Sequence, residues 1–128
     1  MSYLLDTNVV IDHIRKRSRI QRGLIKDGLS LSIISLAELF HGAVKSSNSK
    51  FNLELIYSTI TDWKIEVLKV DTPVSLEYAE IRNELEKSGQ KLENFDILIA
   101  ATARIYNKTL VTNNRKHFER IKNLKILE

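Results

Sequence analysis

Three carboxylates, each at or near the start of a predicted helix, are the groups of this chain whose type and placement could do chemistry: Asp6, Glu38 and Asp96. Carboxylates about 5 Å apart repel by roughly 3 kcal/mol at an effective dielectric of 20. Three of them brought together would therefore raise one another's pKa or bind a cation. Ligands that are all oxygen atoms favour Mg²⁺ or Mn²⁺, whereas zinc would need histidine or cysteine. The three acids thus predict a site for a hard divalent metal, provided that the fold brings them together.

Hydrophobic patterning predicts strands that alternate with helices along the chain. The strands are expected at residues 3–5, 29–33, 65–70 and 109–112, with an edge strand at 124–127. Helices are expected from residues 9, 35 and 72, over 50–62 and over 97–103, and a second short helix or a loop precedes Asp27-Gly28. Such alternation is typical of a parallel sheet covered on both faces and built from right-handed crossovers. We therefore predict the α/β fold class, in one domain over residues 1–128.

The predicted fold has a geometric consequence for the acids. Ligands of a parallel sheet bind outside the carboxyl ends of its strands, where the connecting turns and the helix starts collect. Asp6 follows the first strand directly, and Asn114 follows the fourth. Asp96 opens a helix that runs antiparallel to the fourth strand, and Glu38 lies in the first turn of the helix after the second strand. All four residues are therefore expected at one edge of the sheet.

Each acid also has a purely structural explanation. Asp6 can cap a helix, a role worth about 1 kcal/mol, and Ser35 with Glu38 matches the capping box S-x-x-E. Asp96 in a first helical turn gains roughly 0.3 to 1 kcal/mol from the helix dipole. None of these roles predicts three acids in one crevice, with amide side chains nearby and no evident cationic partner. The histidines show no metal-ligand spacing and are assigned no role: His13, His41 and His117.

Composition narrows the kind of partner. The chain has 20 Lys and Arg against 16 Asp and Glu, for a net charge of +4, and a pI near 9.4, which favours a polyanionic partner. Because it lacks cysteine, it has no thiolate nucleophile and no disulfide. No apolar run approaches the roughly 20 residues of a membrane helix, and no signal-peptide layout is present, so we expect a cytoplasmic location. A metal held by acids in a basic protein indicates hydrolysis of a nucleic-acid backbone.

Four segments carry a resemblance that runs the whole length of the chain: Leu5-Asp6-Thr7-Asn8, Ser35-Leu36-Ala37-Glu38-Leu39, Asn94-Phe95-Asp96-Ile97-Leu98-Ile99-Ala100-Ala101, and Leu110-Val111-Thr112-Asn113-Asn114 with Phe118. In this order and spacing they resemble the PIN-domain ribonucleases, specifically the VapC toxins of bacterial toxin-antitoxin pairs. The resemblance implies a three-layer α/β/α fold with a five-stranded parallel sheet and Mg²⁺-dependent or Mn²⁺-dependent endoribonuclease activity. It also implies a toxin homodimer, and inhibition by a VapB antitoxin whose C-terminal segment lies over the active-site groove. Relatives of this type cut structured RNAs, tRNA among them.

The acids match the family pattern position by position: Asp6, Glu38 and Asp96. One position departs from it, because many PIN domains carry a fourth acid just after the fourth strand, where this chain has Asn114. An asparagine can ligate through its carbonyl oxygen or hold a metal-bound water, which leaves one and two metal ions both open. Thr112 and Asn8 are predicted to orient the carboxylates as hydrogen-bond donors, or else to cap turns.

Other functions remain open on the sequence alone. A PIN fold with weak or no catalysis could bind RNA, or could act as an autoregulatory module in a toxin-antitoxin complex that binds operator DNA through the antitoxin, and the missing fourth acid supports this. A phosphatase or phospho-receiver would also place an aspartate after its first strand. That function would need a second acid two residues after Asp6, where Asn8 stands. The basic runs 15–22 and 115–125 either follow an RNA backbone or are solvated helix faces. The apolar residues Ile11, Ile14, Leu53 and Ile56 pack in the core or are covered by the antitoxin or a second subunit.

Overall fold

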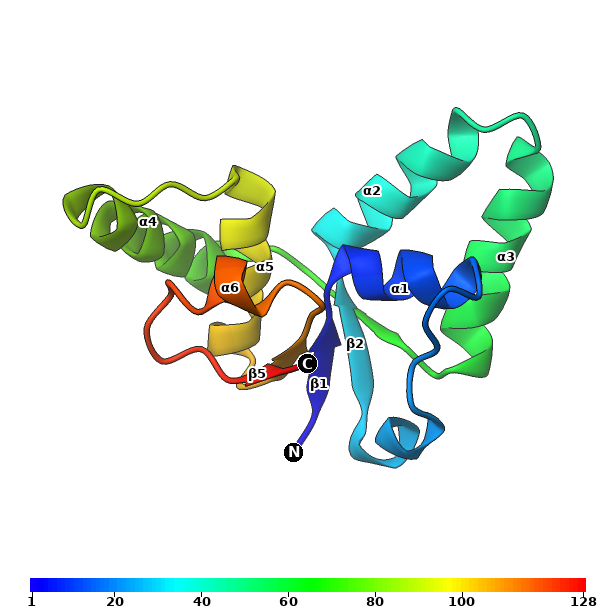
Figure 1. Cartoon of the computed structure of the whole chain (residues 1–128), viewed down its shortest axis with the longest axis horizontal. Helices are drawn as coiled ribbons and strands as arrows, with labels where there is room; N and C mark the ends of the chain where they lie inside the picture. Colours follow the sequence, from blue (N-terminus) through cyan, green and yellow to red (C-terminus); the bar gives the residue numbers. More distant parts are fainter.

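A single parallel sheet forms the centre of the computed structural model, which describes all of residues 1–128. Its strands are β1 (Tyr3–Leu5), β2 (Leu29–Ser32), β3 (Glu66–Leu68), β4 (Thr109–Val111) and β5 (Ile126–Leu127). Their order in the sheet is β3-β2-β1-β4-β5, and every neighbouring pair is parallel. The first strand of the chain is therefore the central one, and the predicted edge strand near the C-terminus is confirmed (Figure 1).

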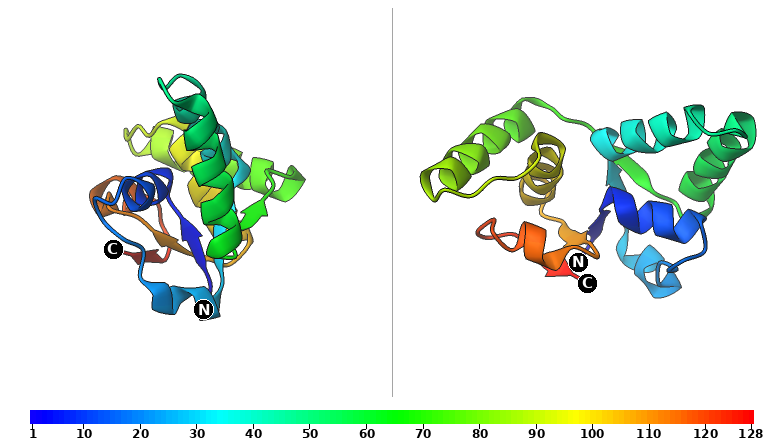
Figure 2. Two further views of the ribbon diagram at one scale, coloured as in Figure 1. Left: turned by 90° about the vertical axis from the view of Figure 1, so that its right-hand side faces the viewer. Right: turned by 45° about the horizontal axis from the view of Figure 1, so that its top comes forward.

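Helices cover both faces of this sheet, as predicted. They are α1 (Thr7–Ile14), α2 (Ile33–Val44), α3 (Ser49–Asp62), α4 (Thr72–Lys87), α5 (Asn94–Ile105) and α6 (Arg115–Phe118), with a 3₁₀ helix η1 (Arg22–Asp27). Figures 1 and 2 show α1, α2 and α3 on one side of the sheet and α4, α5 and α6 on the other. None of these helices has both the length and the apolar character needed to cross a membrane.

The strand β1 shows how the sequence builds the three layers. Leu4 packs into the core on the side of α4 and α5, whereas Tyr3 and Leu5 pack into the core on the side of α1, α2 and α3. This alternation follows from the two-residue period of a strand. Because helices cover both faces, all three residues are hydrophobic and buried. The three-layer α/β/α arrangement is thus confirmed.

The helix starts are set by side-chain caps. Asp6 accepts from the backbone N–H of Thr7 at 2.8 Å, and Asp71 accepts from that of Val74 at 3.1 Å, ahead of α1 and α4. Ser32 caps α2 by accepting from Ile34 N at 3.1 Å. The helix therefore begins at Ile33, two residues before the predicted start.

Several predicted boundaries are wrong by a few residues. The strand β2 ends at Ser32 because its hydroxyl caps the next helix, and β3 and β5 are shorter than the ranges 65–70 and 124–127. The apolar segment 97–103 is the inner part of α5, which starts at Asn94. These differences leave the predicted order of elements unchanged.

Candidate active site

Asp6, Glu38 and Asp96 line one groove, of about 510 Å³, at the carboxyl edge of the sheet. Asp6 follows β1 and is 5 % exposed. Glu38 lies on α2, and Asp96 lies in the first turn of α5. His41 and Lys45 also line the groove. The predicted convergence of three acids from distant parts of the sequence is therefore present in the structure.

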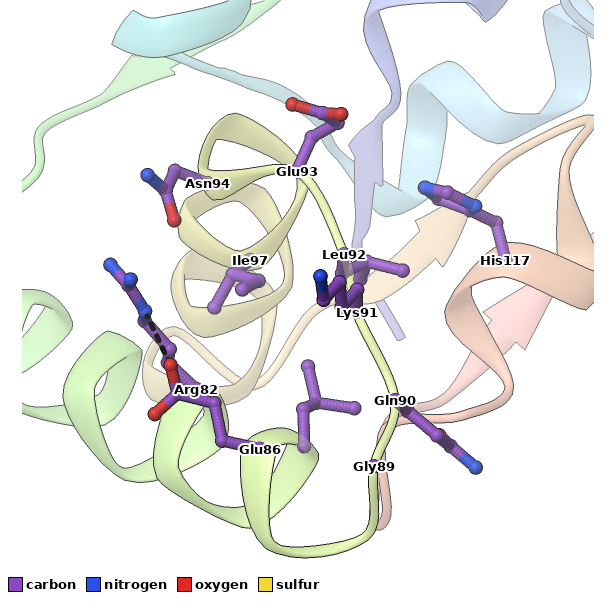
Figure 3. A pocket seen from close by; sticks show the side chains of 11 residues that line it. Arg82, Glu86, Gly89, Gln90, Lys91, Leu92, Glu93, Asn94, Ile97 and His117 are labelled. Carbon is purple, nitrogen blue, oxygen red and sulfur yellow. Dashed lines mark hydrogen bonds and ion pairs between the residues drawn. The ribbon is translucent and has the colours of Figure 1, made fainter.

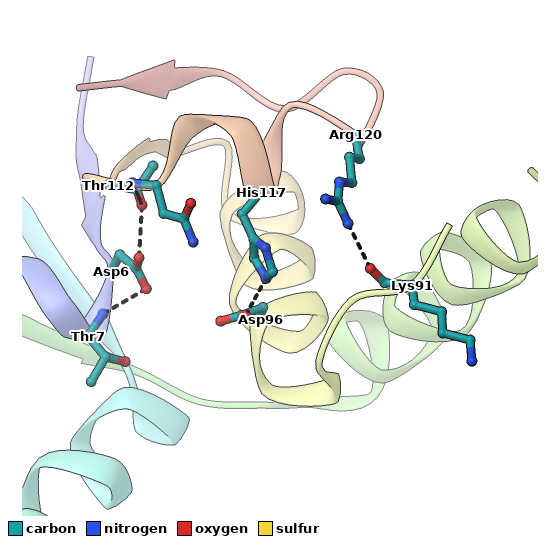
Figure 4. Close-up of polar contacts among 8 residues, drawn as sticks. Asp6, Thr7, Lys91, Asp96, Thr112, His117 and Arg120 are labelled. Atoms are coloured by element: carbon teal, nitrogen blue, oxygen red, sulfur yellow. Dashed lines mark hydrogen bonds and ion pairs between the residues drawn. The ribbon is translucent and has the colours of Figure 1, made fainter. Parts of the chain in front are cut away.

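Asp6 is held from two sides. Its Oδ1 accepts from the backbone N–H of Thr7, and its Oδ2 accepts from the hydroxyl of Thr112, both at 2.8 Å (Figure 4). The backbone N–H of Asn114 in turn donates to Thr112 Oγ1 at 3.0 Å, so the one hydroxyl proton of Thr112 is left to point at the carboxylate. The backbone N–H of Asp6 donates to Val111 O at 2.9 Å, which fixes the main chain beside β4.

The electrostatics of the groove are those of crowded acids. Burial is the largest cause that raises the pKa of Asp6 above its ordinary value of 3.8, and the negative charges of Asp96 and Glu38 raise it further. The hydrogen bonds from Thr112 and Thr7 oppose this rise, because they stabilise the ionised form. A cation bound among the three acids would relieve the same repulsion.

Thr7 connects two of the acids. Its backbone N–H donates to Asp6, and its Oγ1 lies 2.9 Å from Glu38 Oε1 and 2.8 Å from Ser35 Oγ. Since an ionised carboxylate can only accept, the Thr7 hydroxyl proton goes to Glu38, and the contact with Ser35 uses the Ser35 proton. Ser35 is fully buried inside α2. The capping-box explanation of Ser35 and Glu38 is therefore wrong, because both side chains contact α1 instead of the start of their own helix.

His117 is a site residue that sequence reasoning missed. Its Nε2 lies 2.9 Å from Asp96 Oδ2, and the two side chains are 27 % and 29 % exposed (Figure 4). The histidine lies on the single-turn helix α6, next to the fully buried Phe118, which anchors that turn in the core. Its position in the sequence could have predicted this role, because the residues that follow β4 lie at the same edge of the sheet as Asp96. The prediction that His117 has no role is thus wrong, because its side chain contacts one of the three acids.

Comparison with known proteins identifies the family. The family model described as PIN domain matches residues 3–124. Ribonuclease VapC2 of Rickettsia felis is 36% identical, covering 100% of this chain and 97% of that protein. The chain belongs to the PIN-domain family and, within it, to the VapC ribonucleases. A tRNA(fMet)-specific endonuclease VapC of Shigella flexneri is 33% identical to this VapC-family chain, covering 98% of this chain and 96% of that protein.

Solved structures agree with this assignment. The Rickettsia felis VapBC2 complex bound to a DNA fragment from its promoter contains a chain with a TM-score of 0.92 and 35% identity, covering 99% of this VapC-family chain and 98% of its own. DNA-bound VapBC from Salmonella typhimurium contains one with a TM-score of 0.91 and 33% identity, covering 99% and 97%.

The donors in the groove of this VapC-family chain suit Mg²⁺ or Mn²⁺. No lysine or arginine forms an ion pair with the three acids. As the side chains stand, no three Asp, Glu or His residues lie close enough together to form a metal-binding group by themselves. Mg²⁺ keeps several waters and usually takes only one or two protein carboxylates. An open, oxygen-lined groove of this kind therefore fits it.

The two asparagines of the predicted site lie differently. Asn8 lines the groove and is exposed. Asn114 is also exposed, precedes α6, and contacts the site through its backbone N–H bond to Thr112, whereas its side chain is not among those that line the groove. The role of Asn114 as a ligand of the metal stays a prediction.

Proposed function

We propose that this VapC-family chain is the toxin of a VapBC-type pair and a metal-dependent endoribonuclease of the cytoplasm. The observation that carries the proposal is the groove in which Asp6, Glu38 and Asp96 meet without a lysine or arginine partner. The names of its relatives, ribonucleases and tRNA(fMet)-specific endonucleases, support RNA as the substrate, with tRNA as the first RNA to test.

The residues divide the work of hydrolysis. Asp6 and Asp96 would hold Mg²⁺ or Mn²⁺ directly, Glu38 would ligate it or orient the attacking water, and Asn114 would complete the shell. When bound, the ion supplies a water of lowered pKa and neutralises charge on the phosphate. Thr7, with its bonds to Asp6 and Glu38, keeps two carboxylates in place before RNA arrives. Cleavage should leave a 5′-phosphate and a 3′-hydroxyl.

An antitoxin is the proposed protein partner. Structural relatives are VapBC complexes, some of them bound to DNA, which supports a VapB-type antitoxin and operator binding through it. Beside the catalytic groove, a smaller hollow of about 120 Å³ with a partly apolar lining lies between α1, α2 and α3. Its residues include Ile11 and Ile14, which are half-buried, and Ile56, which is buried. An apolar segment of the antitoxin would complete their burial. The toxin homodimer remains a prediction.

The decisive experiment compares purified Asp6→Asn and Asp96→Asn with wild type on total tRNA in Mg²⁺. Each variant keeps the size of the side chain and removes one negative charge, so each should cut at least about 10-fold more slowly, the lower end of the loss seen when the support of a metal ligand is removed. Asp27→Asn is the matched control, because Asp27 is exposed, does not line the groove and ends η1 just before β2, at the opposite edge of the sheet. If either site variant cuts as fast as wild type, the assignment is wrong.

The alternative is a VapC-family module that binds RNA or antitoxin with weak or no catalysis, as the amide at Asn114 would allow. Cutting by wild type in Mg²⁺ that stops when a chelator is added would exclude it. Sequencing of RNA ends after induced expression would then show which RNA is cut and where.

A further inference from the structure

A second cavity, of about 460 Å³, shares no lining residue with the catalytic groove and is drawn in Figure 3. It is enclosed by the second half of α4, the connecting segment 88–93 and the start of α5. Leu85 and Ile97, 4 % and 2 % exposed, form its floor together with the half-buried Leu92. We call it the flanking cavity. Its volume lies within the roughly 300 to 1,000 Å³ of small-ligand pockets.

The rim of the flanking cavity carries hydrogen-bonding groups that the protein leaves free. Asn94 Oδ1 accepts from the hydroxyl of Tyr78 at 2.9 Å, so its amide NH₂ remains as a donor. Gln90 and Lys91 are exposed, and their side chains form no hydrogen bond or ion pair within the chain. An apolar floor with free amide donors and one unpaired cation fits a ligand with a flat apolar face, polar edges and a negative charge.

His117 links the flanking cavity to an acid of the catalytic groove. This residue lines the flanking cavity, while its Nε2 lies 2.9 Å from Oδ2 of Asp96, which lines the groove. Figure 3 shows the imidazole reaching from α6 toward the segment 88–93. An RNA strand with a phosphate bound to a metal ion at Asp96 would therefore pass His117 to enter the flanking cavity.

The connecting segment is held in this position. Arg120 donates from Nη1 to the carbonyl oxygen of Lys91 at 2.9 Å (Figure 4), and the backbone N–H of Gln90 donates to Leu85 O at 2.9 Å. The walls of the cavity thus exist before a ligand binds, which lowers the entropic cost of binding.

The remaining charges at the rim narrow the choice of ligand. Arg82 is engaged by Glu86 at 3.4 Å and by the Tyr78 hydroxyl at 2.9 Å. In Figure 3 the carboxylate of Glu93 points away from the apolar centre. Lys91 is thus the cation available to a phosphate.

We propose that the flanking cavity is a nucleotide subsite: it receives one nucleotide of the RNA strand next to the phosphate that a metal ion ligated by Asp96 would bind. The base lies on the floor of Leu85, Leu92 and Ile97, and a phosphate contacts Lys91. The edge of the base meets the amide of Asn94, and that of Gln90 once this exposed side chain, which points outward in Figure 3, turns inward. This inference rests on the proposed ribonuclease function and adds to it a place where the identity of one base is read. Amide side chains can tell bases apart by their hydrogen-bonding edges.

The first test measures binding of a short single-stranded RNA by fluorescence anisotropy with a chelator present, so that nothing is cut. Lys91→Glu should weaken binding and lower the salt dependence by about 0.7 in log–log slope, as expected for one lost phosphate contact. Lys87→Glu makes the same charge change on an exposed lysine of α4 that does not line the cavity. If both variants bind RNA equally well, the subsite is refuted.

The second test removes bases one at a time by placing an abasic residue at successive positions of the same RNA. For wild type, one position should show a loss of roughly 3- to 10-fold, the effect of one or two hydrogen bonds and base contacts. In Gln90→Ala that extra loss should largely disappear, because the partner of the base is already missing. Equal losses at every position in both proteins would overturn the proposal.

The outcomes separate this inference from the proposed function. If wild type cuts no RNA in Mg²⁺ but shows the Lys91 and Gln90 effects on binding, the ribonuclease proposal fails and the subsite stands. If wild type cuts RNA while both variants bind and cut like wild type, the subsite fails alone. Loss of affinity for an antitoxin peptide, with RNA binding unchanged, would assign the cavity to the antitoxin and refute the proposal.

Discussion

Replacement of Thr112 by valine tests how the site holds its most buried acid. Valine has nearly the same shape but no hydroxyl, so Asp6 Oδ2 loses the donor that lies 2.8 Å away. Thr112 is 0 % exposed, and solvent therefore has no direct route to replace that donor. A hydrogen bond to a charged group contributes about 1.5 to 3 kcal/mol to stability. We expect Thr112→Val to lower the free energy of unfolding by about 2 kcal/mol at neutral pH.

The expected change in melting temperature follows from the size of the chain. Unfolding entropy is about 2.1 cal/mol/K per residue, which for 128 residues amounts to roughly 0.27 kcal/mol/K. A loss of about 2 kcal/mol thus lowers Tm by about 7 °C. Thr112→Ser keeps the hydroxyl and removes one methyl group, so it serves as the control and should lose about 1 kcal/mol from packing alone.

The stability difference between wild type and Thr112→Val should depend on pH in a defined direction. Burial is the main cause that raises the native pKa of Asp6 above its ordinary value of 3.8. At any pH between these two pKa values, Asp6 is more often protonated in the folded state than in the unfolded state. The contribution of Asp6 to stability therefore improves as the pH falls through its native pKa. Once Asp6 is protonated, it no longer needs a strong donor, and the difference between wild type and Thr112→Val should shrink.

Thermal melts followed by circular dichroism, from neutral pH down toward 3.8, would measure this difference for wild type and both variants. A loss in Thr112→Val that stays constant over the whole range would mean that the hydroxyl does not stabilise an ionised Asp6. A loss no larger than that of Thr112→Ser would mean that packing, and not the hydrogen bond, is what the threonine contributes. Either result would refute the reasoning.

Three further predictions concern the rest of the site and its support. His117→Ala should release the carboxylate of Asp96 and weaken Mn²⁺ binding, measured by calorimetry, by about 10-fold or more. His117→Gln keeps a hydrogen-bond donor and should recover part of this loss. Equal Mn²⁺ affinities of wild type and His117→Ala would show that the contact does not position Asp96. Mg²⁺ should raise the Tm of wild type but not that of Asp6→Asn, since only a native metal site links the ion to stability; calorimetric melts with and without a chelator check this. Tyr106→Phe removes the donor that does most to lower the pKa of Asp71. A lowered native pKa contributes stability that is lost as the pH falls through it. Below pH 3.8 the Tm of Tyr106→Phe should therefore fall less steeply with decreasing pH than the Tm of wild type. An equally steep fall of Tm in both proteins would contradict this.

The sequence was informative where a signal is local. Pro73 predicted the start of α4, and the spacing of apolar residues predicted α3. Both signals are readable because helix starts and periodicity depend on only a few neighbouring residues. The placement of Asp6, Glu38 and Asp96 at one edge also followed, since in a parallel sheet the element order alone decides which edge a residue occupies.

The details of the site did not follow, because they depend on how helices pack against one another. Ser35 and Glu38 satisfy a local capping rule, yet their partner is Thr7, 28 and 31 residues earlier in the chain. Ser32, which precedes them, supplies the cap instead. Only the packing of α1 on α2 distinguishes these two arrangements, and no spacing in the sequence reports it.

The segment after β4 shows how the site is organised beyond its three acids. It departs from the family pattern at Asn114, which on the sequence alone looked like the weak point of the site. In the structure the two ends of this segment contact two of the three acids: Thr112 donates to Asp6, and His117 contacts Asp96. The buried Phe118 anchors α6, the helix that carries His117, in the core. This segment therefore braces two of the carboxylates, whether or not Asn114 ligates the metal, and its histidine also borders the flanking cavity.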